Sequence, residues 1–153
     1  MKRLIPLLFI NLLLFKGTAL PHCEVPCGIY DDEMRIHMLK EHIRTIRKSM
    51  VSIMDLSKEK KKNYNQIVRW INNKETHANY IQDIVYQYFM AQRIKPVKSS
   101  DKTLYNKYIN QITLLHRMIV YAMKVKQTND IKYVEELTKL VHEFQGIYFS
   151  NKR

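Results

Sequence analysis

Apolar side chains recur at alternating steps of three and four residues between Asp31 and Ser57, with charged side chains between them. This spacing places the apolar positions on one stripe of an amphipathic helix. Asp31 or Asp32 is expected to cap the helix, with Glu33 in its first turn, where a carboxylate is favourable. The stripe comprises Ile36, Leu39, Ile43, Ile46, Met50 and Ile53.

Three further segments show the same period. The lysine-rich run 58–62 predicts a loop, and a second stripe then extends to about Gln92, before Pro96. Ser99-Ser100-Asp101 offers the cap of a third helix, and a polar turn at 126–130 precedes a fourth, for which Gly146 is the expected stop. The stripes comprise Ile67, Trp70, Ile71, His77, Ala78, Ile81, Ile84, Val85, Tyr88 and Phe89; then Leu104, Tyr108, Ile112, Leu115, Ile119 and Ala122; then Ile131, Val134, Leu137, Val141 and Phe144.

Four helical segments with short polar connections predict an all-α fold, an antiparallel up-down four-helix bundle. No alternating strand pattern or internal repeat competes with this interpretation. A chain of 153 residues can bury one core, so one domain is expected. Aromatic side chains on the second segment are interpreted as core or interface residues rather than as the lining of a cofactor site: Tyr80, Tyr86, Tyr88 and Phe89.

The first residues have the order of a secretory signal. Met1-Lys2-Arg3 is basic, residues 4–15 are almost wholly apolar, and Gly17-Thr18-Ala19 is small. The apolar run is too short to span a bilayer as a helix. Residues 1–21 are therefore expected to be a leader that is removed, and residues 22–153 the exported domain, periplasmic or secreted, with no membrane attachment after leader removal.

The chain is strongly basic. Loss of Lys2, Arg3 and Lys16 with the leader lowers the formal net charge from +12 to +9. Such a charge favours anionic partners, and on charge alone nucleic acid, acidic glycans and small anions are all compatible. The lysines are scattered, however, which is typical of a solvated basic surface. No nucleic-acid partner is predicted.

The histidines of the expected bundle do not have metal-ligand spacing. His37 and His42 are five residues apart, and His77, His116 and His142 stand singly on different segments. Helical metal sites usually place ligands four residues apart, and di-iron bundles use a Glu-x-x-His pair, which this chain lacks. Candidate chemistry therefore concentrates near the N-terminus.

The segment HCEVPCGIYDD, residues 22–32, holds both cysteines of the chain. A small disulfide loop between Cys23 and Cys27 is one interpretation for an exported protein. If processing exposes His22, its α-amine and imidazole join two thiolates, and the Cys23 amide nitrogen becomes a further donor. Two nitrogens and two sulfurs in a plane suit Ni(II) better than tetrahedral zinc, and copper fits this geometry as well.

Proline and glycine favour a chain that curls around one ion. Pro26 holds Val25 in an extended conformation and offers no competing N–H group. Gly28, directly after Cys27, can adopt a backbone conformation that other residues rarely take. The sequence thus predicts a compact N-terminal metal-binding hook.

The run from His22 to Asp31 resembles the nickel hook, H-C-x-x-P-C-G-x-Y, of the nickel superoxide dismutase family. The resemblance continues through Asn73-Lys74-Glu75, residues 82–89 and Arg93-Ile94-Lys95-Pro96, and it covers residues 22–148. It implies a homohexamer of four-helix bundles with one nickel ion per subunit. The implied activity is disproportionation of superoxide to dioxygen and hydrogen peroxide through a Ni(II)/Ni(III) cycle.

The resemblance also implies roles for individual residues. The His22 amine, the Cys23 amide and the sulfurs of Cys23 and Cys27 would form the ligand plane, with the His22 imidazole as the axial ligand of the oxidised ion. Tyr30 would stand beside the open face and control the approach of superoxide, and the Val25–Pro26 peptide would be cis. Thiolate and deprotonated amide donors enrich nickel in electron density and so favour Ni(III).

The chain departs from the family beside the axial ligand. In the family a glutamate on the first helix and an arginine on the second support the imidazole, whereas the nearest matching positions here hold His37 and His77, the candidates for that supporting role.

Maturation is expected to need two cleavages. Signal peptidase is expected to cut after Ala19, so a processing protease must then remove Leu20-Pro21 to expose His22.

Two other functions are compatible with the same residues. The chain could be an exported basic four-helix adaptor without enzymatic activity, in which a Cys23–Cys27 disulfide pins the N-terminus. It could also be a nickel or copper carrier that uses the hook without turnover. Metal content and thiol state distinguish the adaptor from the enzyme, and superoxide decay distinguishes the carrier from it.

Overall fold

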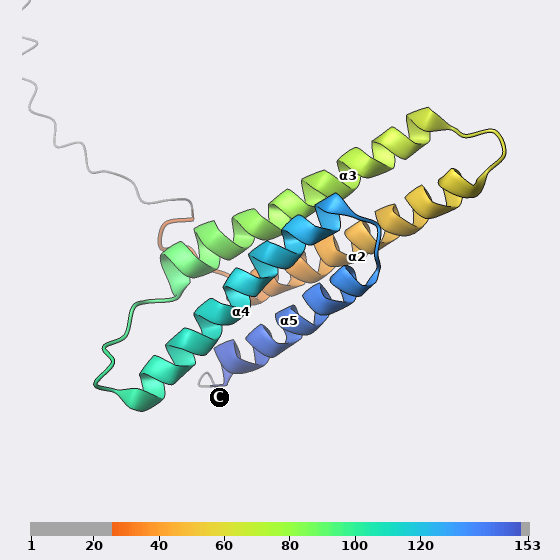
Figure 1. The fold of residues 1–153 in the computed structure, drawn as a ribbon. Helices are drawn as coiled ribbons and strands as arrows, with labels where there is room; N and C mark the ends of the chain where they lie inside the picture. The colour runs from red at the N-terminus through yellow and green to blue at the C-terminus, as the bar shows by residue number, and fades with distance from the viewer. Residues whose placement is uncertain (1–25, 151–153) are drawn as a thin grey trace, which may run out of the picture.

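The structure is a computed structural model that describes residues 26–150, and these residues form helices without a β-strand (Figure 1). Helix α2 spans Asp32–Lys58, and α3 spans Tyr64–Asp83 and continues as the π-helix η1, Ile84–Arg93. Helices α4, Lys102–Gln127, and α5, Lys132–Phe149, complete an up-down-up-down bundle. The predicted all-α four-helix bundle is confirmed.

Polar side chains fix the starts of three helices. Asp31 caps α2 by accepting a 2.9 Å bond from the amide of Met34, and Asp101 caps α4 in the same way through Leu104. Both caps are as the sequence predicts. Asn63 caps α3 through the amide of Gln66, so this helix begins three residues before the first apolar position of its stripe.

One predicted helix end is wrong, and one predicted helix changes its type before its end. Gly146 does not stop the last helix, because α5 continues through it to Phe149 and the glycine lies on the exposed face. The second helical segment ends at Arg93, as predicted to within one residue, but its last turns form the π-helix η1 rather than an α-helix. Gly146 is tolerated within α5 because an exposed glycine costs a helix only about 1 kcal/mol, which the partly buried side chains that flank it offset.

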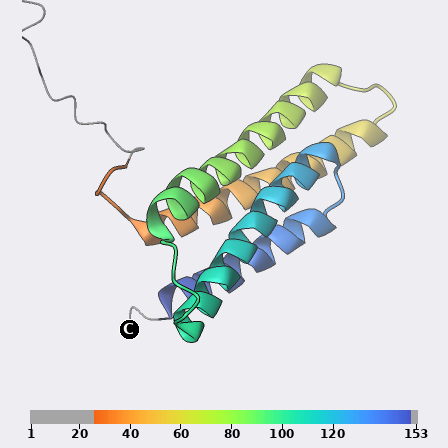
Figure 2. The same cartoon turned by 60° about the vertical axis from the view of Figure 1, so that its left-hand side comes forward.

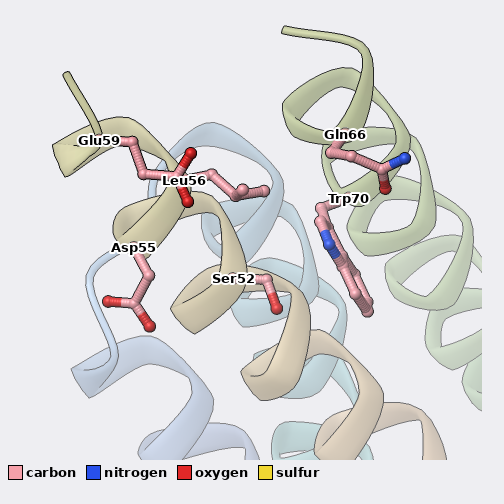
Figure 3. A pocket seen from close by; sticks show the side chains of 6 residues that line it. All are labelled: Ser52, Asp55, Leu56, Glu59, Gln66 and Trp70. Atoms are coloured by element: carbon pink, nitrogen blue, oxygen red, sulfur yellow. The ribbon is translucent and has the colours of Figure 1, made fainter. Parts of the chain in front are cut away.

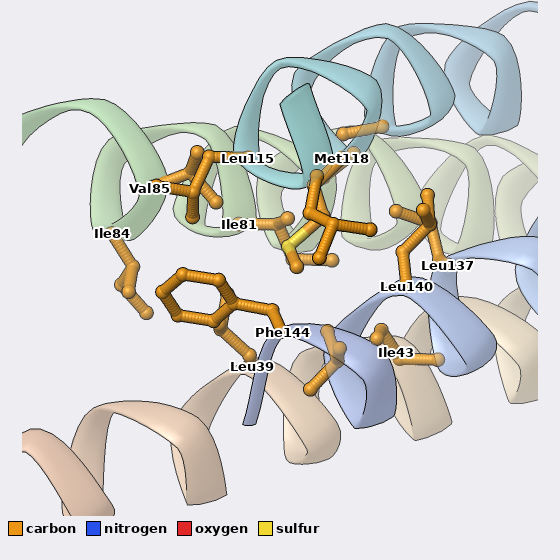
Figure 4. Packing of buried hydrophobic residues seen from close by; sticks show 14 of the residues in the cluster. Leu39, Ile43, Ile81, Ile84, Val85, Leu115, Met118, Leu137, Leu140 and Phe144 are labelled. Atoms are coloured by element: carbon orange, nitrogen blue, oxygen red, sulfur yellow. The ribbon is translucent and has the colours of Figure 1, made fainter. Parts of the chain in front are cut away.

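The core joins all four helices and holds large aromatic side chains toward the end where α2 begins, whereas no residue of α3 before Lys74 is buried. Figure 4 shows the part of the core around Phe144. Phe144 of α5 and Phe89 of η1 pack edge to face there, with ring centroids 5.0 Å apart. Two positions of the predicted stripes are exposed, Ile71 by 37% and Leu104 by 48%. Fully buried members of the core include Leu39, Ile46, Met50, Ile81, Val85, Leu115, Met118, Leu137 and Leu140.

The two ends of the bundle differ. One end carries the short connections 59–63 and 128–131. The opposite end gathers the segment before α2, the end of η1, the longer connection 94–101 and the end of α5 (Figure 2). None of the described helices is both long and apolar enough to cross a membrane. The fold therefore places the start of α2 at the end of the molecule with the most chain segments.

Candidate metal centre

The segment from Pro26 to Asp31 leads into α2 at the crowded end of the bundle (Figure 2). Cys27 is exposed, and Tyr30, three residues later, is 38% exposed. Of the predicted metal ligands, only Cys27 lies within the described residues. His22 and Cys23 lie outside them, as do the leader 1–21, the Leu20-Pro21 processing site and Val25 of the Val25–Pro26 peptide.

Gly28 has the backbone conformation that the sequence predicts for it. Its φ angle is +79°, in the left-handed region that side-chain-bearing residues rarely adopt. A Cβ atom added there would meet no heavy atom within 4 Å. The requirement for glycine is therefore conformational rather than steric, and the chain bends at this position, directly after Cys27.

Two side chains of η1 hold the ring of Tyr30. The guanidinium carbon of Arg93 lies 4.2 Å from the centroid of the Tyr30 ring, within the range of a cation–π contact. The ring of Tyr88 meets Tyr30 edge to face, with centroids 5.8 Å apart. Tyr30 is thus fixed against the bundle although the three residues before it are exposed.

Asp32, at the first position of α2, is the buried acceptor on which these side chains converge. Arg93 donates to both carboxylate oxygens, from Nε at 2.8 Å and from a terminal nitrogen at 2.9 Å. The hydroxyl of Tyr88 donates at 2.8 Å and that of Tyr148 at 2.9 Å. A buried carboxylate is tolerated only when it is paired and hydrogen-bonded, and Asp32 meets both conditions.

The π-helix explains how Tyr88 and Arg93 reach the same carboxylate. They are five residues apart, a spacing that an α-helix places on different faces. In η1 the hydrogen bonds run from residue i+5 to residue i, as from the amide of Ile94 to the carbonyl of Phe89 at 2.8 Å. Residues five apart therefore stack on one face, and both side chains point toward the start of α2.

The carboxylate also sets the protonation states around it. Burial, followed by the hydrogen bond to Asp32, raises the pKa of Tyr148 to about 12 and raises that of Tyr88 as well. The hydrogen bond to Asp32 raises the pKa of Arg93 above its ordinary value. Both phenols therefore remain hydrogen-bond donors, and Arg93 remains cationic, across the pH range in which proteins function.

A small pocket separates the start of the described chain from η1. Its volume is about 140 Å³, which exceeds the space that a single water molecule needs. The guanidinium carbon of Arg35 lies 4.9 Å from the centroid of the Tyr88 ring on one side of it. A diatomic anion could enter such a space. The pocket is lined by Pro26, Arg35, Asp83, Ile84, Gln87 and Tyr88.

Farther along the bundle, His77 of α3 pairs with His42 of α2. Their Nδ1 atoms are 3.0 Å apart, so one ring donates to the other. Burial and then the charge of His77 lower the pKa of His42, with an opposing effect of Glu41. Within residues 26–150 no hydrogen bond or ring contact joins His37 to His77, and His37 is exposed. The structure thus places His42, rather than His37, beside His77.

A second pocket lies at the far end of the bundle, where Trp70 of α3 faces Leu56 of α2 (Figure 3). Its carboxylates, Asp55 and Glu59, are too few for a cluster of metal ligands. Across residues 26–150 no group of three or more His, Cys, Asp or Glu side chains could hold an ion. The far pocket is therefore a weaker candidate for chemistry than the end that carries Cys27.

Sequence reasoning missed three members of the cluster around Asp32. Asp32 itself was considered only as a cap, although the doublet Asp31-Asp32 supplies two carboxylates where one cap suffices. Arg93 was noted only within the resemblance and Tyr148 not at all. The five-residue spacing of Tyr88 and Arg93 gives no signal unless the π-helix is known.

Comparison with protein families matches residues 17–152 to the nickel-containing superoxide dismutases. Neither the comparison with curated proteins nor that with solved structures found a match. The family match covers most of the chain, so the predicted resemblance to this family is confirmed. The protein belongs to the nickel-containing superoxide dismutases, and is thus an enzyme that disproportionates superoxide and uses nickel as its cofactor.

Proposed function

We propose that the nickel ion is held by the N-terminal hook, one ion per subunit, with His22, Cys23 and Cys27 as ligands. The observation that carries this proposal is the left-handed Gly28 between Cys27 and a fixed Tyr30. It turns the chain directly after one sulfur ligand, while Tyr30 anchors the other end of the turn to the bundle. The hook therefore has a rigid base on which its remaining residues can wrap.

The donors available from this segment fit nickel. Two thiolates, a terminal amine and a backbone amide are soft and electron-rich ligands, which suit a square-planar ion and favour its oxidation. When bound, nickel would supply the Ni(II)/Ni(III) couple that exchanges single electrons with superoxide. The His22 imidazole would be a further nitrogen donor to the ion.

The described residues would control access to the ion. Tyr30 lies at the base of the hook and is partly exposed, so its ring can limit which molecules pass between the hook and solvent. Arg35, which lines the pocket beside Tyr88, places positive charge at the same end of the bundle, which favours the approach of a small anion, whereas the charge of Arg93 is paired with Asp32. Superoxide is both small and anionic, whereas larger anions would meet the Tyr30 ring.

We propose further that the enzyme is exported and matures in two steps. Removal of the leader after Ala19 would leave Leu20-Pro21 ahead of His22, and a second protease would then expose the His22 amine. Without that step the terminal nitrogen belongs to Leu20 and cannot join the ligand plane.

The subunits would assemble as a homohexamer. Exposed apolar side chains on the first turns of α3 support self-association, because Tyr64, Val68 and Ile71 follow the helical period and are 70%, 53% and 37% exposed.

Electron paramagnetic resonance of the mature protein, combined with N-terminal sequencing, tests the ligand set. We expect a rhombic Ni(III) signal with splitting from one axial nitrogen in chains that begin at His22. Cys27→Ser should abolish nickel binding and superoxide decay while leaving the helical circular dichroism unchanged. His142→Gln, a change of an exposed histidine on α5, is the matched control and should retain both.

Active nickel protein that begins at Leu20 would overturn the ligand set. Metal-free protein with an oxidised Cys23–Cys27 pair would instead favour the adaptor. Protein that binds nickel or copper in the hook without accelerating superoxide decay would favour a carrier.

A further inference from the structure

The Tyr30 ring is held by two side chains that share one acceptor. Arg93 contacts the ring through its guanidinium face, and Tyr88 contacts it through a ring edge. Both side chains donate to the carboxylate of Asp32. We name this group, Asp32, Tyr88 and Arg93, the tyrosine clamp.

We infer that the tyrosine clamp positions Tyr30, and through it the base of the nickel hook, and that Arg93 is its central positioning residue. The inference rests on the proposed role of Tyr30 beside the metal. It adds residues of η1, which is some sixty positions away in the sequence from the hook. The clamp acts through Tyr30 and needs no contact with nickel or superoxide.

The chemistry of arginine fits this position better than that of lysine. A guanidinium is planar, so its edge can bind a carboxylate through two hydrogen bonds while its face covers an aromatic ring. Arg93 does both at once, with 2.8 and 2.9 Å bonds to Asp32 and a 4.2 Å approach to the Tyr30 ring. A lysine in its place would keep the charge but lose either the second bond or the stacked face.

The chain offers a control that separates positioning from stability. Tyr148 of α5 donates to the same carboxylate at 2.9 Å. Its ring contacts among the described residues are with Phe89, Phe144 and Phe149, not with Tyr30. Tyr148→Phe therefore removes one donor to Asp32 and the hydroxyl that interacts with Arg93, but no ring contact of Tyr30, whereas Arg93→Lys changes the contact with Tyr30 itself.

Nuclear magnetic resonance of the metal-free protein tests the clamp without relying on the metal. We expect cross-peaks between the Tyr30 ring protons and the δ-methylene protons of Arg93. In Arg93→Lys the Tyr30 ring resonances should move toward those of a solvated tyrosine, while in Tyr148→Phe they should stay in place. If Arg93→Lys fails to fold, Asp32→Asn, which releases the guanidinium but keeps the side-chain shape, should give the same movement.

The nickel-loaded enzyme supplies the second measurement. Arg93→Lys should change the rhombicity of the Ni(III) signal and lower kcat/KM by about tenfold, the size expected when a supporting residue of a metal site is lost. Tyr148→Phe should leave the signal unchanged and kcat/KM within about twofold.

Two results would overturn the inference: Tyr30 resonances that do not move in Arg93→Lys, or equal effects of the two substitutions. Failure of the hook proposal would appear separately, as absence of nickel from protein whose Tyr30 cross-peaks are intact.

Discussion

Gly28 and Gly146 allow the conformational effect of adding a side chain to be separated from its steric effect. Neither has a heavy atom within 4 Å of the position that a Cβ atom would occupy, but only Gly28 has a positive φ. Replacement by alanine should therefore be unfavourable at Gly28 and favourable at Gly146.

Gly28→Ala is expected to weaken nickel binding by roughly 5- to 30-fold, because holding alanine in the left-handed region costs about 1–2 kcal/mol. Gly146→Ala should instead raise the free energy of unfolding by about 0.5–1 kcal/mol, since alanine favours the helix that α5 continues through this position. Nickel titration of the mature protein and urea unfolding measure the two effects. Equal nickel affinity of Gly28→Ala and the unsubstituted protein would show that the hook does not use this conformation.

His42 should make stability depend on pH. Its pKa in the folded protein lies below the ordinary value of 6.5, so the unfolded chain binds a proton more readily than the folded one does. The free energy of unfolding is therefore expected to fall as the pH drops below about 6.5, and to be fully restored above it.

Urea unfolding of metal-free protein at about pH 5.5 and about pH 7.5 measures this difference. His42→Asn should reduce it, while His142→Asn, at an exposed position on α5, should leave it unchanged. A pH difference that is the same in all three proteins would exclude His42 as its source.

At the scale of the helix, the side chain of Lys74 of α3 caps the C-terminus of α4. Its buried ammonium donates to the carbonyls of Lys126 and Thr128 and to the side chain of Asn129, at 3.0 to 3.2 Å. A helix C-terminus has carbonyls without helical partners and a partial negative charge, so a cation there satisfies both.

Lys74→Met is expected to lower the free energy of unfolding by about 1–3 kcal/mol, because it leaves buried acceptors without a donor. Lys139→Met, on the exposed face of α5, should change it by less than about 0.5 kcal/mol. Thermal unfolding followed by circular dichroism measures both. A loss at Lys74 no larger than that at Lys139 would mean that water replaces the ammonium.

The sequence predicts the helices better than it predicts the group around the hook. The stripes and caps of α2 and α4 follow from local periodicity and from aspartates at the right positions, as with Asp31 and Asp101. The π-helix η1 at the end of α3 does not follow from local periodicity. Its stabilisation comes from the hydrogen bonds of Tyr88 and Arg93 to a carboxylate that is distant in the sequence. Tertiary contacts of this kind leave no periodic signal.

The hook motif, by contrast, can be recognised from the sequence alone. The motif around Cys27 could be recognised because all its donors lie within a few residues, and Gly28 has the conformation predicted for it. The pairing of His77 with His42 rather than with His37 could not be predicted, since it depends on the rotation of α2 against α3.

At the scale of the molecule, the bundle has its own core and the proposed ligands of nickel lie outside it. The core residues come from all four helical segments, and the ligands come from six consecutive residues before them. A ligand stabilises a fold only to the extent that it binds the folded chain more tightly than the unfolded one.

Removal of nickel by a chelator is therefore expected to lower the Tm by only about 2–4 °C, because a hook of adjacent residues can bind nickel in the unfolded chain too. Calorimetry of nickel-loaded and metal-free protein measures the difference, with superoxide decay confirming that the metal is gone. A collapse of the helical signal on chelation would contradict an independent bundle.

The carboxylate of Asp32 also has a consequence for the order in which the chain acquires its structure. Its donors lie 56, 61 and 116 positions away, whereas the opposite end of the bundle is closed by short local connections. Closing a long loop costs more entropy, so we expect the distal hairpins to form early and the surroundings of Asp32 to form last. Because the hook precedes Tyr88, Arg93 and Tyr148 in the chain, it is synthesised before its supports exist. Nickel captured by a nascent chain would meet the sulfur ligands before the side chains that anchor Tyr30 are in place.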